Sequence, residues 1–293
     1  MFESAYGFND QDLSSWDVSS VKDMNHMFTS SDFNGDLSSW KPSSVSDMLC
    51  MFSGATVFNR DLSNWDVTAV TDMSGMFNEA TSFNGDPTNW KPSSGTDMIS
   101  MFYGAIAFNG DLSNWDVSSV TDMSWMFGEA TAFNGDLSRW SVSSVEHMYA
   151  MFFGATTFNG DLSRWDVSTV ADLRRMFVGA TDFNGDLSRW NISSVTELSE
   201  MFSGATDFNG DLSNWDVLNI RNFTQMFYNA EWFNQNMCSW EEAFSHAIVD
   251  DIFLGSGCTF QEDPEGRRGH FCASASCYPV ASPANATVST GSR

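Results

Sequence analysis

One block of residues is repeated along most of this chain, and the block has a period of 25. A Phe-Asn pair begins each block, at Phe8, Phe33, Phe58, Phe83, Phe108, Phe133, Phe158, Phe183, Phe208 and Phe233. A Trp follows each pair, from Trp16 to Trp240, and a Met-Phe pair follows every one of these Trp residues except the last. Self-similarity at a fixed period is typical of arrays in which each unit buries its apolar side against the next. The sequence therefore predicts about ten stacked coils.

The pattern within one block indicates the kind of coil. Its apolar positions are Leu112, Trp115, Val117, Val120, Met123, Met126, Phe127, Ala130 and Phe133. The alternation Trp-Asp-Val has the period of a strand with Trp and Val inward, and the later spacing of three and four is that of a helical or 3-10 turn. The spacing L-x-x-W-x-V-x-x-V also matches the leucine-rich consensus. We predict a leucine-rich-repeat-like, right-handed α/β solenoid with short parallel strands, one helical or 3-10 turn per coil, and all repeat Trp rings inward.

The block pattern also divides the chain. We expect an N-terminal edge at 1–7, a solenoid of ten units at 8–240, a cysteine-containing C-terminal cap at 241–279 and a disordered tail at 280–293. The tail prediction comes from the Pro, Ala, Ser and Thr composition after Pro279, which supplies almost nothing for a core.

The composition narrows the classes of partner. Against 38 acidic residues stand 13 basic ones, a net charge of −25, which repels phosphate backbones and anionic membranes. We therefore expect no nucleic-acid partner. No apolar run approaches the roughly 20 residues of a transmembrane segment. The first residues, MFESAYGFND, lack a secretory leader pattern, so we expect either that the protein is not exported or that a leader precedes this chain.

The motif W-D-V-S-x-V-x-x-M-x-x-M-F-x-x-A-x-x-F-N, from about Phe8 to Trp240, resembles the BspA-like leucine-rich-repeat surface proteins and their 25-residue repeat domain of unknown function. The resemblance implies an extracellular or surface-exposed solenoid used for adhesion or protein recognition, without catalytic activity. Two features depart from the family pattern. The fourth unit has Pro87, Pro92 and Gly95 at positions normally held by Leu and Val, and the cysteine-bearing tail is not assigned to the family pattern.

Several repeated residues have a structural interpretation. Stacked copies of Trp and Met-Phe are the expected core of an array, and the repeated Asn suggests a ladder in which an inward amide bonds the backbone of the adjacent coil. An Asp follows the Asn-Gly turn, or Asn59-Arg60 in the third block, at Asp36, Asp61, Asp86, Asp111, Asp136, Asp161, Asp186 and Asp211. We expect each of these carboxylates to accept a backbone N–H in an Asx turn. Weak Ca²⁺ binding along the Asp rows is the alternative.

The position between Trp and Val carries our candidate binding residues, because its side chain should point outward. Down this row the chain reads Asp17, Lys41, Asp66, Lys91, Asp116, Ser141, Asp166, Asn191 and Asp216. The alternation predicts an opposite-charge or hydrogen-bonding ladder. The residue before Trp changes from Ser or Asn to Arg139, Arg164 and Arg189. These residues form either a patch that binds a protein or glycan surface, or an ordinary solvated face.

No arrangement of residues predicts an enzyme, a cofactor or a metal site. The histidines, His26, His147, His246 and His270, are scattered, and the array has no catalytic spacing or Gly-rich phosphate loop. Recognition or adhesion is the function we favour. The alternatives are a structural or filament-forming protein and an ice- or mineral-surface binder that uses hydroxyl rows such as Thr131, Thr156, Thr181 and Thr206.

The cysteines and sequons predict modifications. Four of five cysteines, Cys238, Cys258, Cys272 and Cys277, cluster at the C-terminal end of the array and in the tail, where we expect two disulfides of undecided pairing that staple the open end. A zinc site of Cys258, His270, Cys272 and Cys277 is the alternative, although the spacing fits no standard finger. Asn191, Asn222 and Asn285 head N-x-S/T sequons and permit glycosylation in a secretory host.

Overall fold

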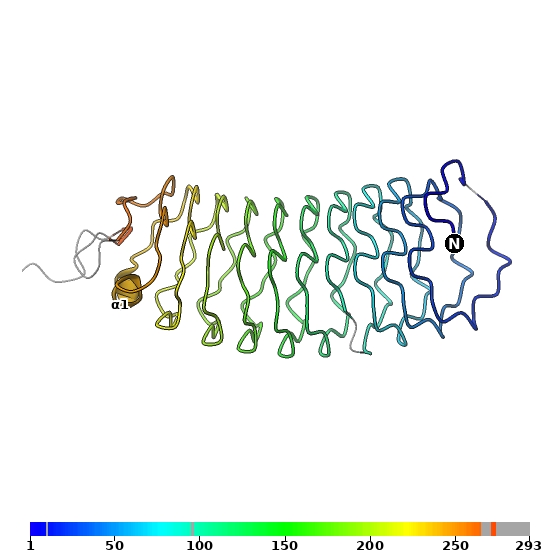
Figure 1. Cartoon of the computed structure of the whole chain (residues 1–293), viewed down its shortest axis with the longest axis horizontal. Coiled ribbons are helices and arrows are strands. Elements are labelled where there is room, and N and C mark those ends of the chain that lie inside the picture. Colours follow the sequence, from blue (N-terminus) through cyan, green and yellow to red (C-terminus); the bar gives the residue numbers. More distant parts are fainter. Residues whose placement is uncertain (10, 95–96, 265–270, 274–293) are drawn as a thin grey trace, which may run out of the picture.

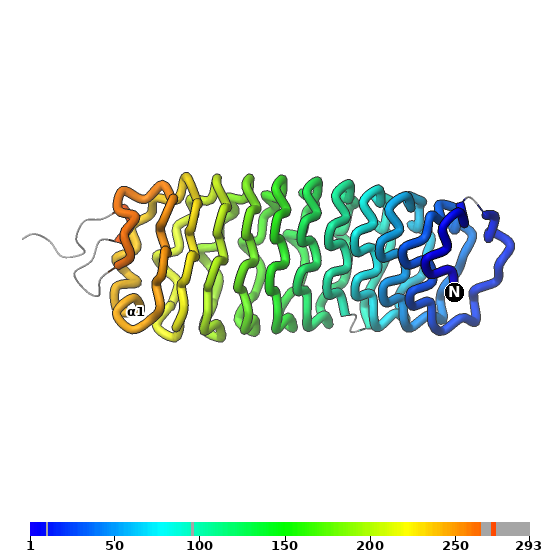
Figure 2. The backbone as a smooth tube through the Cα atoms, turned by 45° about the horizontal axis from the view of Figure 1, so that its top comes forward, coloured from blue at the N-terminus to red at the C-terminus, as the bar shows by residue number. Residues whose placement is uncertain are grey.

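The computed structural model describes residues 1–9, 11–94, 97–264 and 271–273. The chain winds into a row of coils that follow one another along the long axis in sequence order (Figure 1). Turning the molecule by 45° leaves the same single row, with the N-terminus at one end and α1 at the other (Figure 2). Cys277, Asn285 and the predicted tail lie outside the described residues.

Isolated parallel bridges join neighbouring coils at one position per block, four residues before the Met of each Met-Phe pair or its equivalent. We call this set of residues the bridge row. It consists of Asp23, Asp47, Asp72, Asp97, Asp122, His147, Asp172, Glu197, Asn222 and Ile248. Among the described residues no bridge falls on the Trp-Asp-Val segments, where the sequence predicted the strands. Trp115 and Val117 are nevertheless buried, as the alternation predicted, because burial and backbone pairing are separate properties.

Beyond each bridge, cross-coil and local hydrogen bonds alternate along the backbone. The N–H groups of Met123, Trp125 and Phe127 donate to carbonyl oxygens of the next coil at 2.9–3.0 Å. The intervening N–H of Met126 donates within its own coil, to Met123 O at 3.1 Å. Every second donor is therefore used for stacking, and the others close tight turns, so few buried backbone groups lack a partner.

Among the described residues, helices occur only at the C-terminal end of the array and just beyond it. They are a 3-10 helix, η1, at Cys238–Trp240, and α1 at Glu241–Phe244. The coils themselves are built from turns and isolated bridges. The leucine-rich-repeat-like class, its right-handed winding and its short strands stay predictions.

The core contains three columns of aromatic rings that run through the coils. They consist of the Phe of each Met-Phe pair, the Phe of each Phe-Asn pair and the repeated Trp. Phe127 stacks on Phe133 of its own coil at 4.0 Å between ring centroids and on Phe152 of the next coil at 5.6 Å. In the third column the ring of Trp140 stacks on that of Trp165 at 6.4 Å. Aromatic pairs contribute about 0.5–1.5 kcal/mol beyond their burial, so the columns hold each coil to both neighbours.

The tryptophans also tie coils together through their ring N–H groups. Trp140 Nε1 donates to Leu112 O at 3.0 Å and Trp165 Nε1 to Leu137 O at 3.1 Å, each across one coil boundary. The prediction that all repeat Trp rings lie inward is wrong at Trp16, which is 40% exposed. Trp16 belongs to the first coil, where Trp40 covers only one of its faces.

The repeated Asn forms a cross-coil ladder, but not with inward side chains. Asn134 N donates to Asn109 Oδ1 at 2.9 Å, and Asn159 N donates to Asn134 Oδ1 at 3.0 Å. These residues are exposed, so the prediction of inward amides is wrong. The amide oxygen reaches the next coil's N–H from the outer edge of the turn, which requires no buried side chain.

Stacking continues past Trp240. Phe223 N donates to Ile248 O at 2.7 Å, and Phe253 stacks on Phe227 at 5.9 Å, which repeats the contacts of the earlier coils. The buried Cys258 then forms a disulfide with Cys272. One disulfide of the predicted cap is thus present, and Cys277 lies outside the described residues.

The disulfide bears on the zinc alternative, because it occupies two of the thiols that such a site required. His270, a third ligand of that alternative, lies outside the described residues. Within the described residues, no helix is long and apolar enough to cross a membrane.

Candidate recognition face

The predicted outward row lies on the surface, but its carboxylates are used locally. Asp116 Oδ1 accepts the N–H of Ser118 at 3.1 Å and its hydroxyl at 2.6 Å, and Asp166 makes the same pair of contacts with Ser168. Asp17, Asp66, Asn191 and Asp216 likewise accept the N–H two residues ahead. Among the described residues no ion pair joins Lys41 or Lys91 to this row, so the predicted opposite-charge ladder does not form.

The Asp that follows the Asn-Gly turn behaves as the structural interpretation predicted. Asp136 Oδ1 accepts the N–H of Ser138 at 2.9 Å, and the same bond recurs at all eight of these positions. The hydroxyl and N–H of Ser138 lower the pKa of Asp136. Within the described residues no three His, Cys, Asp or Glu side chains converge as ligands of a metal ion would.

The three predicted arginines are exposed and lie beside these turn carboxylates. The guanidinium charges of Arg139, Arg164 and Arg189 each help to lower the pKa of the turn Asp in their own coil, although hydrogen bonds from Ser contribute more. Arg139, Arg164 and Arg189 are thus spread along the edge, one per coil. They do not converge on a common centre with Asp116, Asp166 or Asp216.

Two of the predicted binding residues lie at the same surface hollow. Asp66 and Lys91 line a shallow hollow of about 320 Å³, together with polar side chains that include Asn64 and Asn89. The structure therefore brings together one Asp–Lys pair of the predicted row on neighbouring coils. We call this surface, defined by the residues immediately before and after each Trp, the Trp edge.

A second surface follows the bridge row, and none of the predicted binding residues belongs to it. We call it the variable face, and define it by the residues two, three and six positions after each bridge residue. The third position reads His26, Cys50, Gly75, Ser100, Trp125, Ala150, Arg175, Glu200 and Gln225. These nine coils carry nine different residue types at this position, whereas the Trp and Phe positions of the same coils do not vary.

Aromatic residues of the variable face meet in its central coils. The ring of Trp125 contacts Tyr103 edge-on at 5.6 Å, Tyr149 edge-on at 5.5 Å and Phe153 at 5.2 Å between centroids. All four side chains are half-buried, so part of each ring is open to solvent. Tyr103 and Trp125 also line a hollow of about 240 Å³ with Asn78 and Ser100.

Gly128 makes room for two of these rings. A Cβ atom at Gly128 would lie 2.8 Å from Tyr103 Cδ2 and 3.0 Å from Trp125 Cε3, closer than real Cβ contacts. Gly128 has Tyr103 and Phe153 as its counterparts in the adjacent coils. The position of these two rings therefore depends on glycine at residue 128, where the adjacent coils carry Tyr and Phe.

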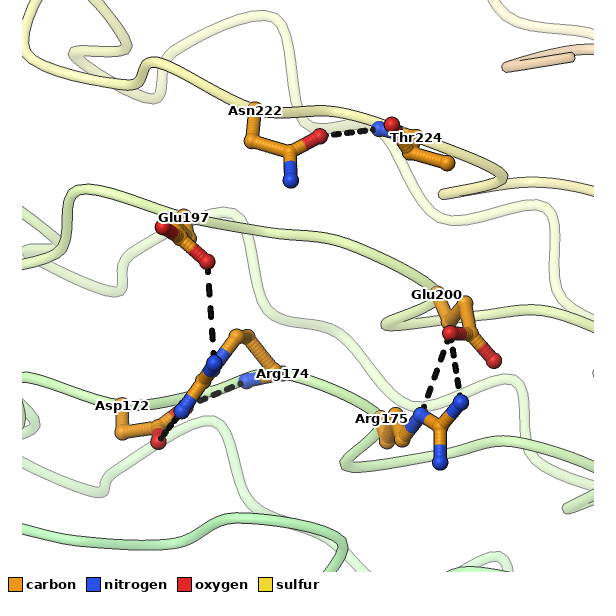
Figure 3. Close-up of polar contacts among 7 residues, drawn as sticks. All are labelled: Asp172, Arg174, Arg175, Glu197, Glu200, Asn222 and Thr224. Atoms are coloured by element: carbon orange, nitrogen blue, oxygen red, sulfur yellow. Dashed lines mark hydrogen bonds and ion pairs between the residues drawn. The ribbon is translucent and has the colours of Figure 1, made fainter. Parts of the chain in front are cut away.

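Ion pairs occupy the variable face beyond the rings (Figure 3). Arg174 Nη2 lies 2.6 Å from Asp172 Oδ2, and Arg174 Nη1 lies 3.7 Å from Glu197 Oε2 in the next coil. Arg175 donates to Glu200 Oε1 through both Nε and Nη2, at 3.1 and 2.7 Å. Burial alone would raise the pKa of Asp172, but the hydrogen bonds and charge of Arg174 lower it.

The same guanidinium also touches an aromatic ring. Arg174 Cζ lies 5.4 Å from the centroid of Tyr149, within the range of a cation–π contact. Tyr149 in turn contacts Trp125, so rings and charges form one continuous cluster. The cluster spans neighbouring coils and has both apolar and ionic parts.

The backbone of the variable face is unusual at its third position. All nine residues there have φ between 51° and 60°, the left-handed region that favours glycine, and Trp125 has φ of 60°. An L-residue in this region costs roughly 1–2 kcal/mol relative to the right-handed conformation. Only Gly75 avoids that cost, so eight coils keep a side chain where glycine would be less strained.

The predicted glycosylation sites differ in their accessibility. Asn191 is exposed, and its Oδ1 accepts the N–H of Ser193 at 3.1 Å. Asn222 is half-buried in the bridge row and accepts the N–H of Thr224 at 2.9 Å (Figure 3). Asn285 lies outside the described residues.

A signal for the variable face is present in the sequence. Because the chain aligns with itself at a period of 25, each position can be compared across nine coils, and the third position after the bridge row differs in every one. The charges and the predicted strand pointed to the Trp edge instead. Tyr103, Trp125, Tyr149 and Phe153 were therefore not among the predicted binding residues.

Comparison with known proteins gave one match to a family. The family model described as "Mycoplasma protein of unknown function, DUF285" matches residues 1–105, 86–181 and 156–262 in tandem. The last match extends beyond Trp240, in agreement with the stacking that continues there. No curated protein matches the chain.

Proposed function

Because the chain belongs to the family of repeat proteins described as Mycoplasma protein of unknown function, DUF285, we propose a function from its surface: non-enzymatic recognition of a protein or glycan partner. The coils hold the surface residues on a rigid backbone, so little ordering entropy opposes binding. The variable face is the recognition surface in this proposal.

One observation carries the proposal. The third position after the bridge row holds nine different residues at φ of 51–60°, where glycine is the least strained choice. Strained residues persist where the surrounding structure holds them, and they gather at binding and active sites. Half-exposed Trp, Tyr and Arg, which are enriched at binding hot spots, lie together on this face.

The Trp edge is the competing surface for the same function. Its support is the hollow that contains Asp66 and Lys91, and the row of Arg139, Arg164 and Arg189. Arginine can engage carboxylates of a protein or an acidic glycan in a bidentate way. Its carboxylates, however, already serve Asx turns, which reduces what they can offer a partner.

Two finer proposals concern kinship and location. The 25-residue motif supports a BspA-like leucine-rich-repeat relationship. The Cys258–Cys272 disulfide supports an extracellular or cell-surface location, because disulfides persist in oxidising compartments. Weak Ca²⁺ binding along the Asp rows has less support, because each turn carboxylate already accepts a hydrogen bond from its own coil.

An ice- or mineral-binding role remains the alternative function, with the Thr row as its surface. Thr181 and Thr206 donate their hydroxyls to the carbonyl oxygens of Thr156 and Thr181, at 3.0 and 3.1 Å. Each of these hydroxyls can still accept a hydrogen bond from a bound surface, but its own hydrogen is already donated to the backbone. A thermal-hysteresis or crystal-growth assay on the intact chain distinguishes this role from recognition.

The test of the proposed function uses two sets of substitutions in the full chain. The first, Tyr103→Ser, Trp125→Gly and Phe153→Ser, introduces residues that other coils carry at the same positions. The second, Arg139→Asn, Arg164→Asn and Arg189→Asn, does the same at the Trp edge. We expect binding to immobilised extracellular proteins or glycans to fall in the first set and to persist in the second. The reverse result would assign the site to the Trp edge, and an intact chain that binds no member of either panel would refute recognition.

A further inference from the structure

We propose, on the premise that the variable face is the recognition surface, that the hollow between Tyr103 and Trp125 receives a cationic side chain, arginine or lysine, from a basic segment of a partner protein. The hollow measures about 240 Å³ and is also lined by Asn78 and Ser100, so it is wide enough for one guanidinium or ammonium group and its stem.

The same face already holds one guanidinium in this way. Arg174 lies over the ring of Tyr149, with Cζ 5.4 Å from the centroid, while the bridge-row carboxylate of Asp172 holds its Nη2 at 2.6 Å. On this backbone an aromatic ring and the bridge-row carboxylates of two neighbouring coils, Asp172 and Glu197, together hold a cation.

The hollow offers the rings, bridge-row carboxylates lie in the same coils, and none of the four residues that line it is a cation. Tyr103 and Trp125 supply the rings, and an indole is the strongest aromatic partner for a cation. The coils that carry Ser100 and Trp125 place Asp97 and Asp122 in the bridge row, where Asp172 lies in its own coil. Asp122 accepts the N–H of Ser124 at 2.8 Å, as Asp172 accepts that of Arg174 at 3.0 Å.

The charge of the surrounding coils selects a cation over other ligands. Between Arg60 and Arg139 the chain has eleven acidic residues, Asp61, Asp66, Asp72, Glu79, Asp86, Asp97, Asp111, Asp116, Asp122, Glu129 and Asp136, and one basic residue, Lys91. Lys91 lines the hollow of the Trp edge. An acidic ligand would meet a negative field here, whereas a basic segment gains from it.

A peptide titration tests the cation directly. The probes are an N-acetylated, C-amidated Gly-Gly-Arg-Gly-Gly peptide, its lysine counterpart and its citrulline counterpart, which has nearly the shape of arginine without the charge. Titrations into the full chain, followed by NMR at the indole N–H of Trp125, detect the millimolar affinities expected of a single side chain. We expect the arginine and lysine peptides to bind and the citrulline peptide to bind about tenfold more weakly, a difference of about 1.4 kcal/mol.

The variants locate the binding. Trp125→Gly removes the indole, so its titration is followed at the backbone N–H signals of Ser100 and Tyr103, which also line the hollow, in the variant and in the wild type. The substitution should weaken binding of the arginine peptide about tenfold without unfolding the coil, because the backbone at this position favours glycine. Trp232→Ala is the matched control, since Trp232 is 65% exposed at the last repeat and outside the hollow, and it should leave binding unchanged.

The outcomes separate this inference from the proposed function. If the citrulline peptide or a neutral disaccharide shifts the Trp125 indole N–H signal as much as the arginine peptide does, the proposal that the hollow selects a cation is wrong. A partner captured equally by the wild-type chain and by Trp125→Gly would overturn the hollow while leaving recognition in place. Failure of the intact chain to bind any macromolecule would overturn both, whatever the peptides do.

Discussion

At the scale of single residues, one position in each coil combines a left-handed backbone with a residue type that differs from coil to coil. The third position after the bridge row is left-handed in all nine coils, with φ of 51–60°, so every side chain there is held against a conformational cost. Ser100, with φ of 55°, follows Gly75, with φ of 59°, in the adjacent coil. The chain therefore contains its own comparison between glycine and a side chain at the same place.

We expect Ser100→Gly to stabilise the protein by about 1 kcal/mol, because the relief of the left-handed serine exceeds the added freedom of glycine in the unfolded chain. Denaturant unfolding of the full chain measures the change. The reverse substitution, Gly75→Ser, is the control and should destabilise, since a Cβ there would lie 2.9 Å from Cys50 Sγ. A Ser100→Gly variant less stable than the wild type would show that the serine side chain, not the backbone, determines stability at this position.

At the scale of one coil, the element is a set of aromatic rings and cross-coil bonds rather than a helix or a strand. Trp115 is 4% exposed, stacks between Trp90 at 6.0 Å and Trp140 at 6.4 Å, and donates through Nε1 to Pro87 O at 3.0 Å. Its loss would leave a cavity and remove contacts on both sides. Each coil thus depends on its neighbours for a full core.

Trp115→Ala should cost roughly 3–5 kcal/mol, the usual range for removal of a buried large aromatic side chain. The midpoint of chemical denaturation measures this loss. Trp232→Ala, at an exposed tryptophan, should change stability by less than about 0.5 kcal/mol. Retained stability in Trp115→Ala would contradict the inward position of the tryptophan column.

The end of the array is a second element, held by the Cys258–Cys272 disulfide across a sequence separation of 14. Phe271, beside this bond, stacks on Phe244 of α1 at 6.0 Å and covers the last coil. Cys258→Ser with Cys272→Ser should therefore destabilise the end of the array by up to about 3 kcal/mol, the value expected for a loop of this length. Faster hydrogen exchange at residues 248–258 than in the central coils is the expected readout.

Peptide mapping of the unreduced protein provides the covalent check. It should find Cys258 joined to Cys272, with Cys50 as the free-thiol reference. Four free thiols after the array, or stoichiometric zinc, would contradict the disulfide-stapled cap.

The sequence predicted the coil's inside better than its outside. The burial of Trp115, Val117 and Phe127 follows from the repeated apolar spacing, because the Trp and Phe recur in each of the nine full repeats, where the Val is replaced only by Pro or Ile. The bridge row could not be predicted from propensity, since Asp is disfavoured in strands and fills most of that row. The aromatic hollow was missed because Trp125 and Tyr103 come together only through stacking of separate coils.

At the scale of the whole molecule, acidic residues are both a source of repulsion and a part of the turns. The net charge of −25 destabilises a compact chain at neutral pH, while Asp residues accept hydrogen bonds in most coils. The turns give the larger local effect at Asp111, Asp136, Asp161 and Asp186, because bonds from Ser lower the pKa of each carboxyl. Asp97 is the opposite case: burial, then Asp72 and Asp122, raise its pKa.

These shifts give the direction of the pH dependence. A carboxyl whose pKa is lowered by folding stabilises the protein fully above its unfolded value of 3.8, and that contribution is lost as the pH falls through the folded pKa. Asp97 acts in the other direction, since its charge is disfavoured in the folded protein as the pH rises above 3.8. The pKa is raised at Asp97 but lowered at six turn carboxyls, Asp36, Asp111, Asp136, Asp161, Asp186 and Asp211, so we expect the thermal midpoint to fall below about pH 4.

Thermal scans from pH 7 to pH 2.5 at a fixed high salt concentration, which screens the net charge, measure this effect. The matched variant replaces Asp111, Asp136, Asp161 and Asp186 by Asn, because Asn191 already accepts the equivalent turn N–H from Ser193 at 3.1 Å. The amide keeps an acceptor at every pH, so this variant should lose less stability in acid than the wild type while it stays folded at pH 7. An equal acid loss in both proteins would place the pH dependence outside these four turns, in Asp36 and Asp211, in the outward row or in the Asp172–Arg174 pair.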